Sequence, residues 1–185
     1  MKRLFAVCVL SLLYTTAFSQ IRYESGYFID NEGNRTEALI RNIDWRYNPS
    51  QFSYKLSPDQ DPKTADIANV MEFGIYNFSR YVRRTVNIDR SSDDTNSLTS
   101  SREPEWSEEM LFLKVIVEGQ ATLLHFEDGS LTRYFYILND EPAEQLIYKR
   151  YKTGPSNIAT NAQYRQQLFM DLRCDNHLGG KPAIT

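Results

Sequence analysis

The sequence predicts a mainly β protein: an antiparallel sheet of hairpins and meanders, arranged as a sandwich or an open barrel, with one amphipathic helix near the C-terminus. The chain has 12 Tyr and 10 Phe against only 8 Gly in 185 residues, and aromatic side chains suit the half-buried surface of a pleated sheet. Short alternating runs are separated by turn sequences, which is typical of hairpins rather than of βαβ units. The spacing of apolar residues changes to a helical period only after residue 160.

The N-terminal half opens with the clearest hairpin. Gly26–Asp30 and Thr36–Arg41 both alternate, and the Asn-Glu-Gly-Asn sequence of Asn31–Asn34 is a strong turn signal. The elements expected next are a loop with aromatic residues over Asp44–Ser50, a strand over Gln51–Leu56, a single helical turn over Ala65–Val70 entered at Asp66, and strands over Met71–Tyr76 and Ser79–Ile88.

The stretch Arg90–Glu105 is rich in Ser, Asp, Asn and Thr and is almost without apolar residues except Leu98. We interpret it as a long, mobile surface loop. It is not a domain boundary, because the strands on either side need each other for cover. We expect Leu98→Asp to change the free energy of unfolding by at most about 0.5 kcal/mol.

The segment Met110–Glu118 is apolar on both faces, which predicts a central strand. Leu113, Val115 and Val117 are expected on its buried face. Val115→Asp should therefore cost several kcal/mol, because it buries an unpaired charge.

Hairpins continue through the second half of the chain. The expected elements are strands over Ala121–Glu127 and Leu131–Leu138 joined by a tight turn at Asp128-Gly129, a break at Asn139–Pro142, a strand over Gln145–Tyr151, and a helix over Ala162–Arg173 capped by Asn161. The apolar stripe of this helix is formed by Tyr164, Leu168, Phe169 and Leu172.

This stripe must be covered, because a helix so short is marginal alone in water. We expect it to pack on the sheet. If the chain is truncated, an apolar patch near Phe169, Met170 and Cys174 should remain exposed and favour self-association. Cys174 could then form an intermolecular disulfide.

The first nineteen residues resemble an export signal. Lys2 and Arg3 precede an uncharged apolar or small run, and Ala17 and Ser19 occupy the −3 and −1 positions of a cleavage site that leaves Gln20 as the new N-terminus. An uncleaved membrane anchor is the alternative, but the run is short for a bilayer span. We therefore expect a signal peptide over 1–19, one β-rich domain over 20–174 and a flexible tail over 175–185.

Charge and cysteine content narrow the classes of function. Cleavage would remove Lys2 and Arg3 and no acid, which changes the formal charge from −3 to −5. A mildly acidic chain has no global attraction for nucleic acid or anionic lipid. Cys8 would leave with the signal, so Cys174 would be alone and an intramolecular disulfide impossible.

Catalytic and cofactor motifs are missing from the sequence. It has no phosphate-binding P-loop, no nucleophile elbow and no His-Glu-x-x-His. Cys174 and His177 have a zinc-like spacing, but no second pair of ligands accompanies them. We therefore predict no catalytic, cofactor-binding or metal-binding residue, and no nucleotide.

Two other patterns have ordinary interpretations. The acid pairs Asp93-Asp94 and Glu108-Glu109 could be glycosidase carboxylates, but neighbours in sequence usually diverge, and solvated acids are common. The basic aromatic runs Arg80–Arg84 and Tyr148–Lys152 resemble surfaces for single-stranded nucleic acid. The expected export and the net negative charge favour strands with one solvated face instead.

Seven sets of segments form a recognisable series along the chain: Gly26–Gly33, Asp44-Trp45 with Asn48-Pro49, Glu72–Tyr76, Val86–Ser91, Phe112–Val115 with Val117–Gly119, Glu144–Lys149 and Tyr164–Leu168. In this order they resemble an uncharacterised exported family of Bacteroidota, chiefly flavobacterial, proteins. The resemblance covers about residues 20 to 174, and it fades after Cys174, which would suit a short or truncated member.

The resemblance implies an exported protein without a known catalytic motif. Some members of the family carry the name tRNA modification GTPase, and some continue into a C-terminal outer-membrane β-barrel. The GTPase name disagrees with this sequence, which has an export signal and neither a P-loop nor an Asn-Lys-x-Asp guanine motif.

The sequence thus favours a non-enzymatic, secreted module of unknown ligand, in the periplasm or associated with the outer membrane. Its expected partner is an envelope protein or an outer-membrane component, not nucleic acid or nucleotide. The alternative is an extracytoplasmic hydrolase, for which His125, Glu127 and Asp128 are the first candidate residues. Their convergence in a pocket would favour the hydrolase, whereas a filled apolar face around His125 would favour the module.

Overall fold

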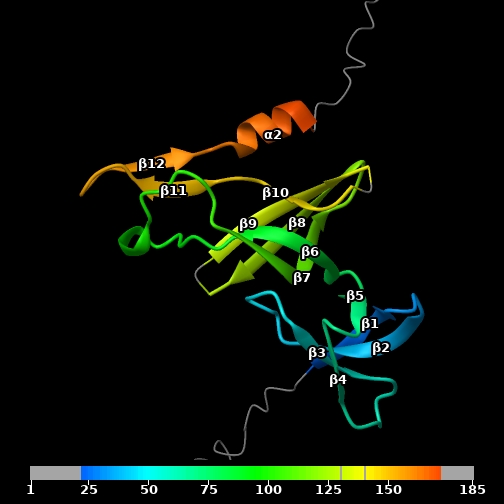
Figure 1. Cartoon of the computed structure of the whole chain (residues 1–185). Helices are drawn as coiled ribbons and strands as arrows, with labels where there is room; N and C mark the ends of the chain where they lie inside the picture. Colours follow the sequence, from blue (N-terminus) through cyan, green and yellow to red (C-terminus); the bar gives the residue numbers. More distant parts are fainter. Residues whose placement is uncertain (1–21, 130, 140, 172–185) are drawn as a thin grey trace, which may run out of the picture.

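The computed structural model describes residues 22–129, 131–139 and 141–171. They form one sheet of ten antiparallel strands curled into a half-barrel, a separate two-stranded hairpin and one short C-terminal helix (Figure 1). The predicted fold class is confirmed, with the open barrel as the better of its two arrangements. The predicted signal peptide over 1–19, Gln20, Leu172 and Arg173 of the predicted helix, Cys174 and the tail with His177 lie outside the described residues.

The ten strands of the sheet are β1 (Arg22–Asp30), β2 (Arg35–Asn42), β3 (Gln51–Lys55), β4 (Lys63–Asp66), β5 (Val70–Ile75), β6 (Ser79–Asp89), β7 (Trp106–Val117), β8 (Ala121–Asp128), β9 (Leu131–Leu138) and β10 (Glu144–Gln145). The remaining elements are the 3₁₀ helix η1 (Thr95–Ser97), the hairpin of β11 (Lys149–Lys152) and β12 (Ile158–Asn161), and the helix α2 (Tyr164–Asp171). Neighbours across the sheet follow the order β10-β9-β8-β7-β6-β5-β1-β2-β3-β4.

The predicted N-terminal hairpin is confirmed. β1 and β2 pair from Arg22 with Asn42 to Ile29 with Arg35. The turn between them places Gly33 at φ +83°, a conformation that glycine adopts without the clash of a Cβ atom.

The predicted helical turn over Ala65–Val70 is wrong. β4 ends at Asp66, and three residues turn the chain into β5. The side chain of Asp66 does cap backbone N–H groups, since its Oδ1 accepts from Ala68 and Asn69, but it caps this turn rather than a helix. Because the connection is so short, the outer strand β4 must curl back towards β5.

Two hydrophobic cores lie on opposite faces of the sheet. The aromatic core comprises Ala38, Ile40, Phe52, Val70, Phe73, Ile75, Tyr81 and Phe112. The aliphatic core comprises Val82, Val86, Ile88, Leu113, Leu124, Phe126, Leu131, Phe135 and Ala143. Tyr81 and Val82 are consecutive in β6, and Phe112 and Leu113 are consecutive in β7, so the alternation of strand side chains sends each pair into different cores.

The predicted central strand is confirmed, but its predicted buried face is right only in part. β7 lies between β6 and β8, Leu113 is fully buried, and Val115 packs partly buried against the aliphatic core. Val117 is 57% exposed, because the pairing of β7 with β8 shifts register between Val115 and Val117. Such an irregularity breaks the alternation on which the prediction rested.

The segment Arg90–Glu105 is the long surface loop that its composition predicts, with most of its residues exposed, but the expected exposure of Leu98 is wrong. Leu98 is only 5% exposed, so we now expect Leu98→Asp to be strongly destabilising. The segment is anchored at Asp89, whose Oδ1 accepts hydrogen bonds from the backbone of Ser91 and Glu105. It also pairs with β11, where the N–H of Lys152 donates to the carbonyl of Thr99.

The C-terminal elements differ most from the prediction. The strand expected over Gln145–Tyr151 is divided between β10 and β11, and β12 was not expected at all. Asn161 is the buried last residue of β12 and donates to the carbonyl of Arg102. It therefore does not cap the helix, which begins at Tyr164.

The apolar stripe of α2 is not packed on the sheet. No residue of α2 is buried, and Phe169 and Met170 are 67% and 64% exposed. The helix is instead held by its polar side chains. Gln167 Oε1 accepts the N–H of Ile147, and Gln167 Nε2 donates to the carbonyl of Gln145.

Candidate functional site

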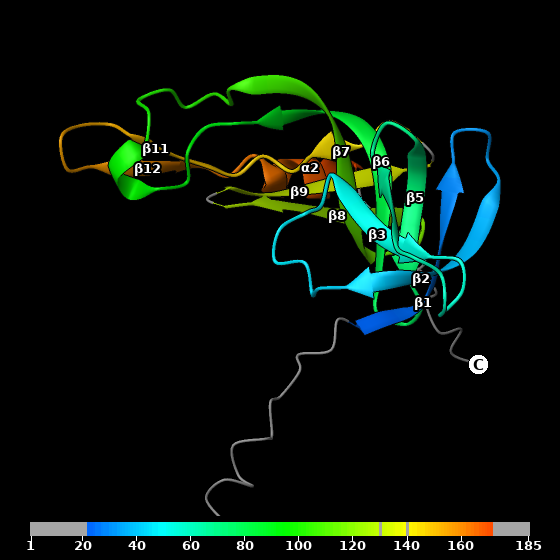
Figure 2. The ribbon, with the colours of Figure 1, turned by 90° about the horizontal axis from the view of Figure 1, so that it is seen from below.

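The segment of residues 146–171, which we name the C-terminal arm, builds the largest hollow described here. It leaves β9 where the N–H of Leu146 donates to the carbonyl of Tyr134, forms the β11–β12 hairpin, and returns where the N–H of Tyr164 donates to the carbonyl of Ile147. Figures 1 and 2 show the hairpin beside η1, away from β1–β4.

Hydrogen bonds hold the hairpin against the segment Arg90–Glu105. Lys149 is almost fully buried, and its Nζ donates to the carbonyl of Glu103 at 2.7 Å. Lys152 Nζ donates to the carbonyl of Asn96 at 3.1 Å. These contacts fix the outer wall of the hollow to the segment Arg90–Glu105.

The hollow, which we name the apolar groove, has a volume of about 680 Å³. The residues that line it are Asp93, Leu123, Thr132, Arg133, Tyr134, Leu146, Tyr148, Arg150, Tyr164 and Leu168. β8 and β9 supply one wall, and the arm supplies the other. Tyr134 and Tyr148 are about half exposed, so their rings are free to contact a ligand.

One positive charge of the apolar groove is uncompensated. Asp93 and Arg133 neutralise each other at 2.7 Å. Arg150 donates to Thr95 Oγ1 at 3.2 Å, and among the residues that the structure describes no carboxylate lies within 4.0 Å of its guanidinium. The groove thus combines an apolar, aromatic lining with one free cation.

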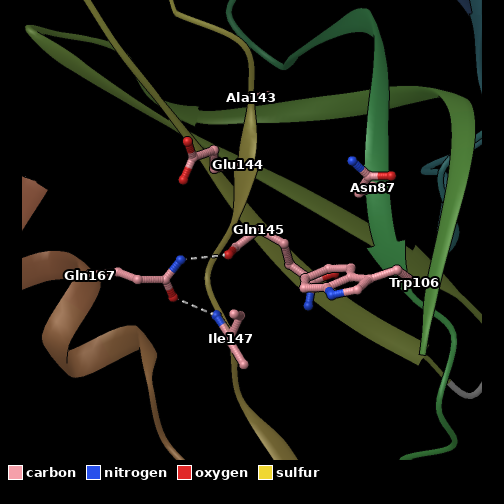
Figure 3. Close-up of a pocket in the computed structure, with 7 residues that line it drawn as sticks. All are labelled: Asn87, Trp106, Ala143, Glu144, Gln145, Ile147 and Gln167. Carbon is pink, nitrogen blue, oxygen red and sulfur yellow. Dashed lines mark hydrogen bonds between the residues drawn. The ribbon is translucent and has the colours of Figure 1, made fainter. Parts of the chain in front are cut away.

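A second hollow of about 390 Å³ lies between β6, β7, β10 and α2 (Figure 3). We name it the Trp106 hollow, because Trp106 is 49% exposed on its wall. Gln145 and Trp106 both line this hollow. Gln145 Oε1 accepts the N–H of Asp89, while its Nε2 is buried without a hydrogen-bond partner in the described structure. The amides of Gln145 and Gln167 mainly join structural elements here.

His125 lies on the same face of β8 as Leu123, and its ring packs on Tyr134 with a centroid distance of 5.0 Å. Its Nε2 is 4.0 Å from a carboxylate oxygen of Glu127. Burial lowers the pKa of His125 below its ordinary value, and the charge of Glu127 offsets this only in part. A neutral, half-buried His125 against a tyrosine ring is the arrangement expected of a packing residue.

Asp128 does not join His125 and Glu127. It follows Glu127 in β8, so it points to the other face, where it accepts a hydrogen bond from Arg90. Neither of the two hollows described above is lined by any of these three residues. The proposed hydrolase residues therefore do not converge.

The acid pairs also diverge, as expected for surface acids. Asp93 pairs with Arg133, whereas Asp94 caps η1 through the N–H of Asn96. Glu109 pairs with Arg90, whose hydrogen bonds lower the pKa of that carboxyl, whereas Glu108 is exposed.

The two basic aromatic runs, Arg80–Arg84 and Tyr148–Lys152, have different roles in the structure. In the first, Arg80 pairs with Glu72 and Glu118, so its charge is used within the protein. The second run, Tyr148–Lys152, supplies the ring of Tyr148 and the charge of Arg150 to the apolar groove. Sequence reasoning noticed this run but missed the groove, because its other wall comes from β8 and β9.

Comparison with known proteins adds no assignment. No protein-family model, no curated protein and no solved structure matches the chain. Within the described ranges, no group of three or more His, Cys, Asp or Glu side chains is placed to hold a metal ion. No helix among the described residues has the length and apolar character needed to cross a membrane.

Proposed function

We propose that the chain is an exported, non-enzymatic binding module of the bacterial cell envelope and a member of the Bacteroidota family that its segments resemble. The observation that carries the binding role is the apolar groove. Its volume of about 680 Å³ lies in the range of ligand sites, about 300 to 1,000 Å³, and its lining of apolar and aromatic side chains with few polar groups is typical of them.

Export is supported by the charge, apolar run and small residues of positions 1–19. An envelope location explains why the chain needs no nucleotide motif, since nucleotides are scarce outside the cytoplasm. GTP should therefore not raise the melting temperature. If GTP did bind, a concentration of 100 times its dissociation constant would stabilise the protein by about 2.7 kcal/mol.

The non-enzymatic role is supported by the separation of the hydrolase candidates. A general base needs a reactive group and an orienting partner within hydrogen-bond reach. His125 instead packs on Tyr134, and Asp128 is held by Arg90 on the opposite face. Within residues 22–129, 131–139 and 141–171, the hydrolase alternative thus has no assembled constellation in its favour.

Fractionation of the native host tests the location. We expect the protein outside the cytoplasm with Gln20 as its first residue, as read by N-terminal sequencing. A cytosolic protein with an intact Met1 would refute the envelope assignment. The binding role is tested separately by ligand titration of the purified protein, with variants of the apolar groove.

A further inference from the structure

We propose that the apolar groove binds a single-chain amphiphile with an anionic head group, and that Arg150 pairs with this head group. The inference rests on the proposed binding role and adds the chemical class of the ligand. It is carried by two observations, the apolar lining of the groove and the uncompensated charge of Arg150.

The lining determines the chain of the ligand. Leucine side chains from both walls, Leu123 from β8 and Leu168 from α2, contribute apolar surface to the same hollow. Tyr148 and Tyr164 contact each other edge to face, with centroids 6.1 Å apart, and extend this surface along the arm. Such a lining favours burial of alkyl groups, which stabilises binding by about 0.8 kcal/mol per buried CH₂.

The charges determine the head group. Three charged side chains line the groove, and two of them, Asp93 and Arg133, are paired. Arg133 also donates to the carbonyls of Asp89 and Ser91, so its guanidinium is committed to the protein. Arg150 remains, with a hydroxyl as its partner. A guanidinium pairs best with a carboxylate, sulfate or phosphate, whose oxygens match its fork of N–H donors.

The position of Arg150 agrees with this division of roles. It belongs to β11, at the end of the arm that lies beside η1, and it is partly exposed. A ligand could therefore lie with its chain between Leu123, Tyr134 and Leu168 and keep its head group partly solvated. This arrangement avoids the cost of removing an ionised group completely from water.

Titration with three ligands of equal chain length tests the proposal: decanoate, 1-decanol and decyltrimethylammonium, all below micelle formation. We expect wild type to bind decanoate most tightly, and this preference to weaken as salt is added. Arg150→Gln should weaken decanoate binding about three- to fivefold and leave 1-decanol within about twofold, because a partly exposed ion pair contributes at most about 1 kcal/mol.

Two further variants separate the possible results. Leu168→Ser, on the exposed helix α2, should weaken both decanoate and 1-decanol. Arg46→Gln removes an exposed guanidinium that does not line the groove and should change neither. Melting temperatures of all variants establish that the fold is retained.

Each contrary outcome has a distinct meaning. Equal binding of decanoate and 1-decanol, unchanged by Arg150→Gln, would overturn the anionic head group but keep the groove as a binding site. No binding of any ligand would overturn both the inference and the binding role. Binding to vesicles of anionic phospholipid but not to monomeric decanoate would overturn the single-chain ligand in favour of a membrane surface.

Discussion

The aromatic core and the aliphatic core are carried by the same two central strands but are held together in different ways. In the aromatic core, the ring of Phe73 stacks on Phe52 and Tyr81 with centroid distances of 4.2 and 4.9 Å, and Phe112 meets it edge to face at 5.0 Å. Ring geometry of this kind adds about 0.5–1.5 kcal/mol per pair beyond the area buried. The aliphatic core consists mostly of Val, Leu and Ile side chains, which pack without such orientation.

The sheet has an N-terminal half, β1–β5, and a C-terminal half, β8–β10, which share the central strands β6 and β7. The two halves are also closed in different ways. The N-terminal half is closed covalently, because only three residues join β4 to β5. The C-terminal half is closed by polar side chains. Gln145 of β10 accepts the N–H of Asp89 of β6, and the buried Arg133 binds the carbonyls of Asp89 and Ser91. Because aliphatic side chains pack without a preferred orientation, the shape of this half depends on its buried polar groups.

The largest expected effect comes from removing this polar closure. Arg133→Ala would leave Asp89 buried without its cation, whose Nη2 lies 3.6 Å from Asp89 Oδ2. Losing one partner of a buried pair costs about 3–5 kcal/mol, and we expect a loss of this size in chemical denaturation. Limited proteolysis should also cut the segment Arg90–Glu105 faster. Arg46→Ala, at an exposed position, is the control and should stay within about 0.5 kcal/mol of wild type. Equal stabilities would mean that Arg133 does not close the half-barrel.

A cavity in the aliphatic core tests whether the two halves unfold together. Leu113→Ala should cost about 3 kcal/mol, because Leu113 is fully buried. Since β6 and β7 carry both cores, the loss should appear in the aromatic half too. The two tryptophans report this separately: Trp45 packs edge to face on Phe73 and Tyr81, and Trp106 is the first residue of β7.

Leu113→Ala is made in two single-tryptophan backgrounds, Trp45→Phe and Trp106→Phe. The unfolding transition followed by the fluorescence of the remaining tryptophan should shift by the same amount in both. A shift of the Trp106 transition alone would show that the halves are independent units, against the shared-strand description.

Asn48 also links the two halves, in addition to the shared strands β6 and β7. Its Nδ2 donates to the carbonyls of Phe112 and His125, and its Oδ1 accepts the N–H of Glu127, in the region where β7 and β8 no longer pair. Asn48→Ala leaves these backbone groups unpaired and should cost about 2 kcal/mol in denaturant unfolding. Asn69→Ala, at an exposed turn, is the matched control. A cost for Asn48→Ala no larger than for its control would remove Asn48 from this linking role.

The smallest effect concerns the polar side of the N-terminal half. Burial alone would raise the pKa of Glu72, but hydrogen bonds from Arg80 and Tyr27, together with the Arg80 charge, bring it below its ordinary 4.5. The unfolded state then binds more protons as the pH falls, so this contribution to stability is present above pH 4.5 and is lost on acidification. Glu72→Gln should cost about 1 kcal/mol at pH 7, and the difference should shrink steadily as the pH falls below 4.5. A difference that is constant with pH would contradict the titration of Glu72.

The N-terminal half was the more predictable from sequence, for a physical reason. Hairpins such as Arg22–Asn42 depend on local turn chemistry and alternation, which the sequence displays directly. The central position of β7 followed in the same way from its apolar run. The exposure of Val117 could not be predicted, because the register shift arises between two strands.

The C-terminal half was less predictable because polar residues build it. Arg90–Glu105 has the composition of a solvated loop. Nothing in its own sequence shows that Arg133, some forty residues later, donates hydrogen bonds to the carbonyls of Asp89 and Ser91. The apolar groove has the same origin, since Leu123 and Leu168 belong to elements distant in the chain. Tyr148 and Arg150 were noticed as a pattern, but their role depends on contacts that only the fold creates.

The lengths of the two outermost strands have a consequence for behaviour at high concentration. An open sheet edge presents unpaired N–H and C=O groups on which another chain can add a strand, which is a route to aggregation. Here the outer strands are β4, with four residues and a leading Lys63, and β10, with two residues and Glu144. Short, charged edges of this kind offer little template for strand addition. A ten-stranded sheet that never closes completely can thereby stay free of edge-to-edge polymers.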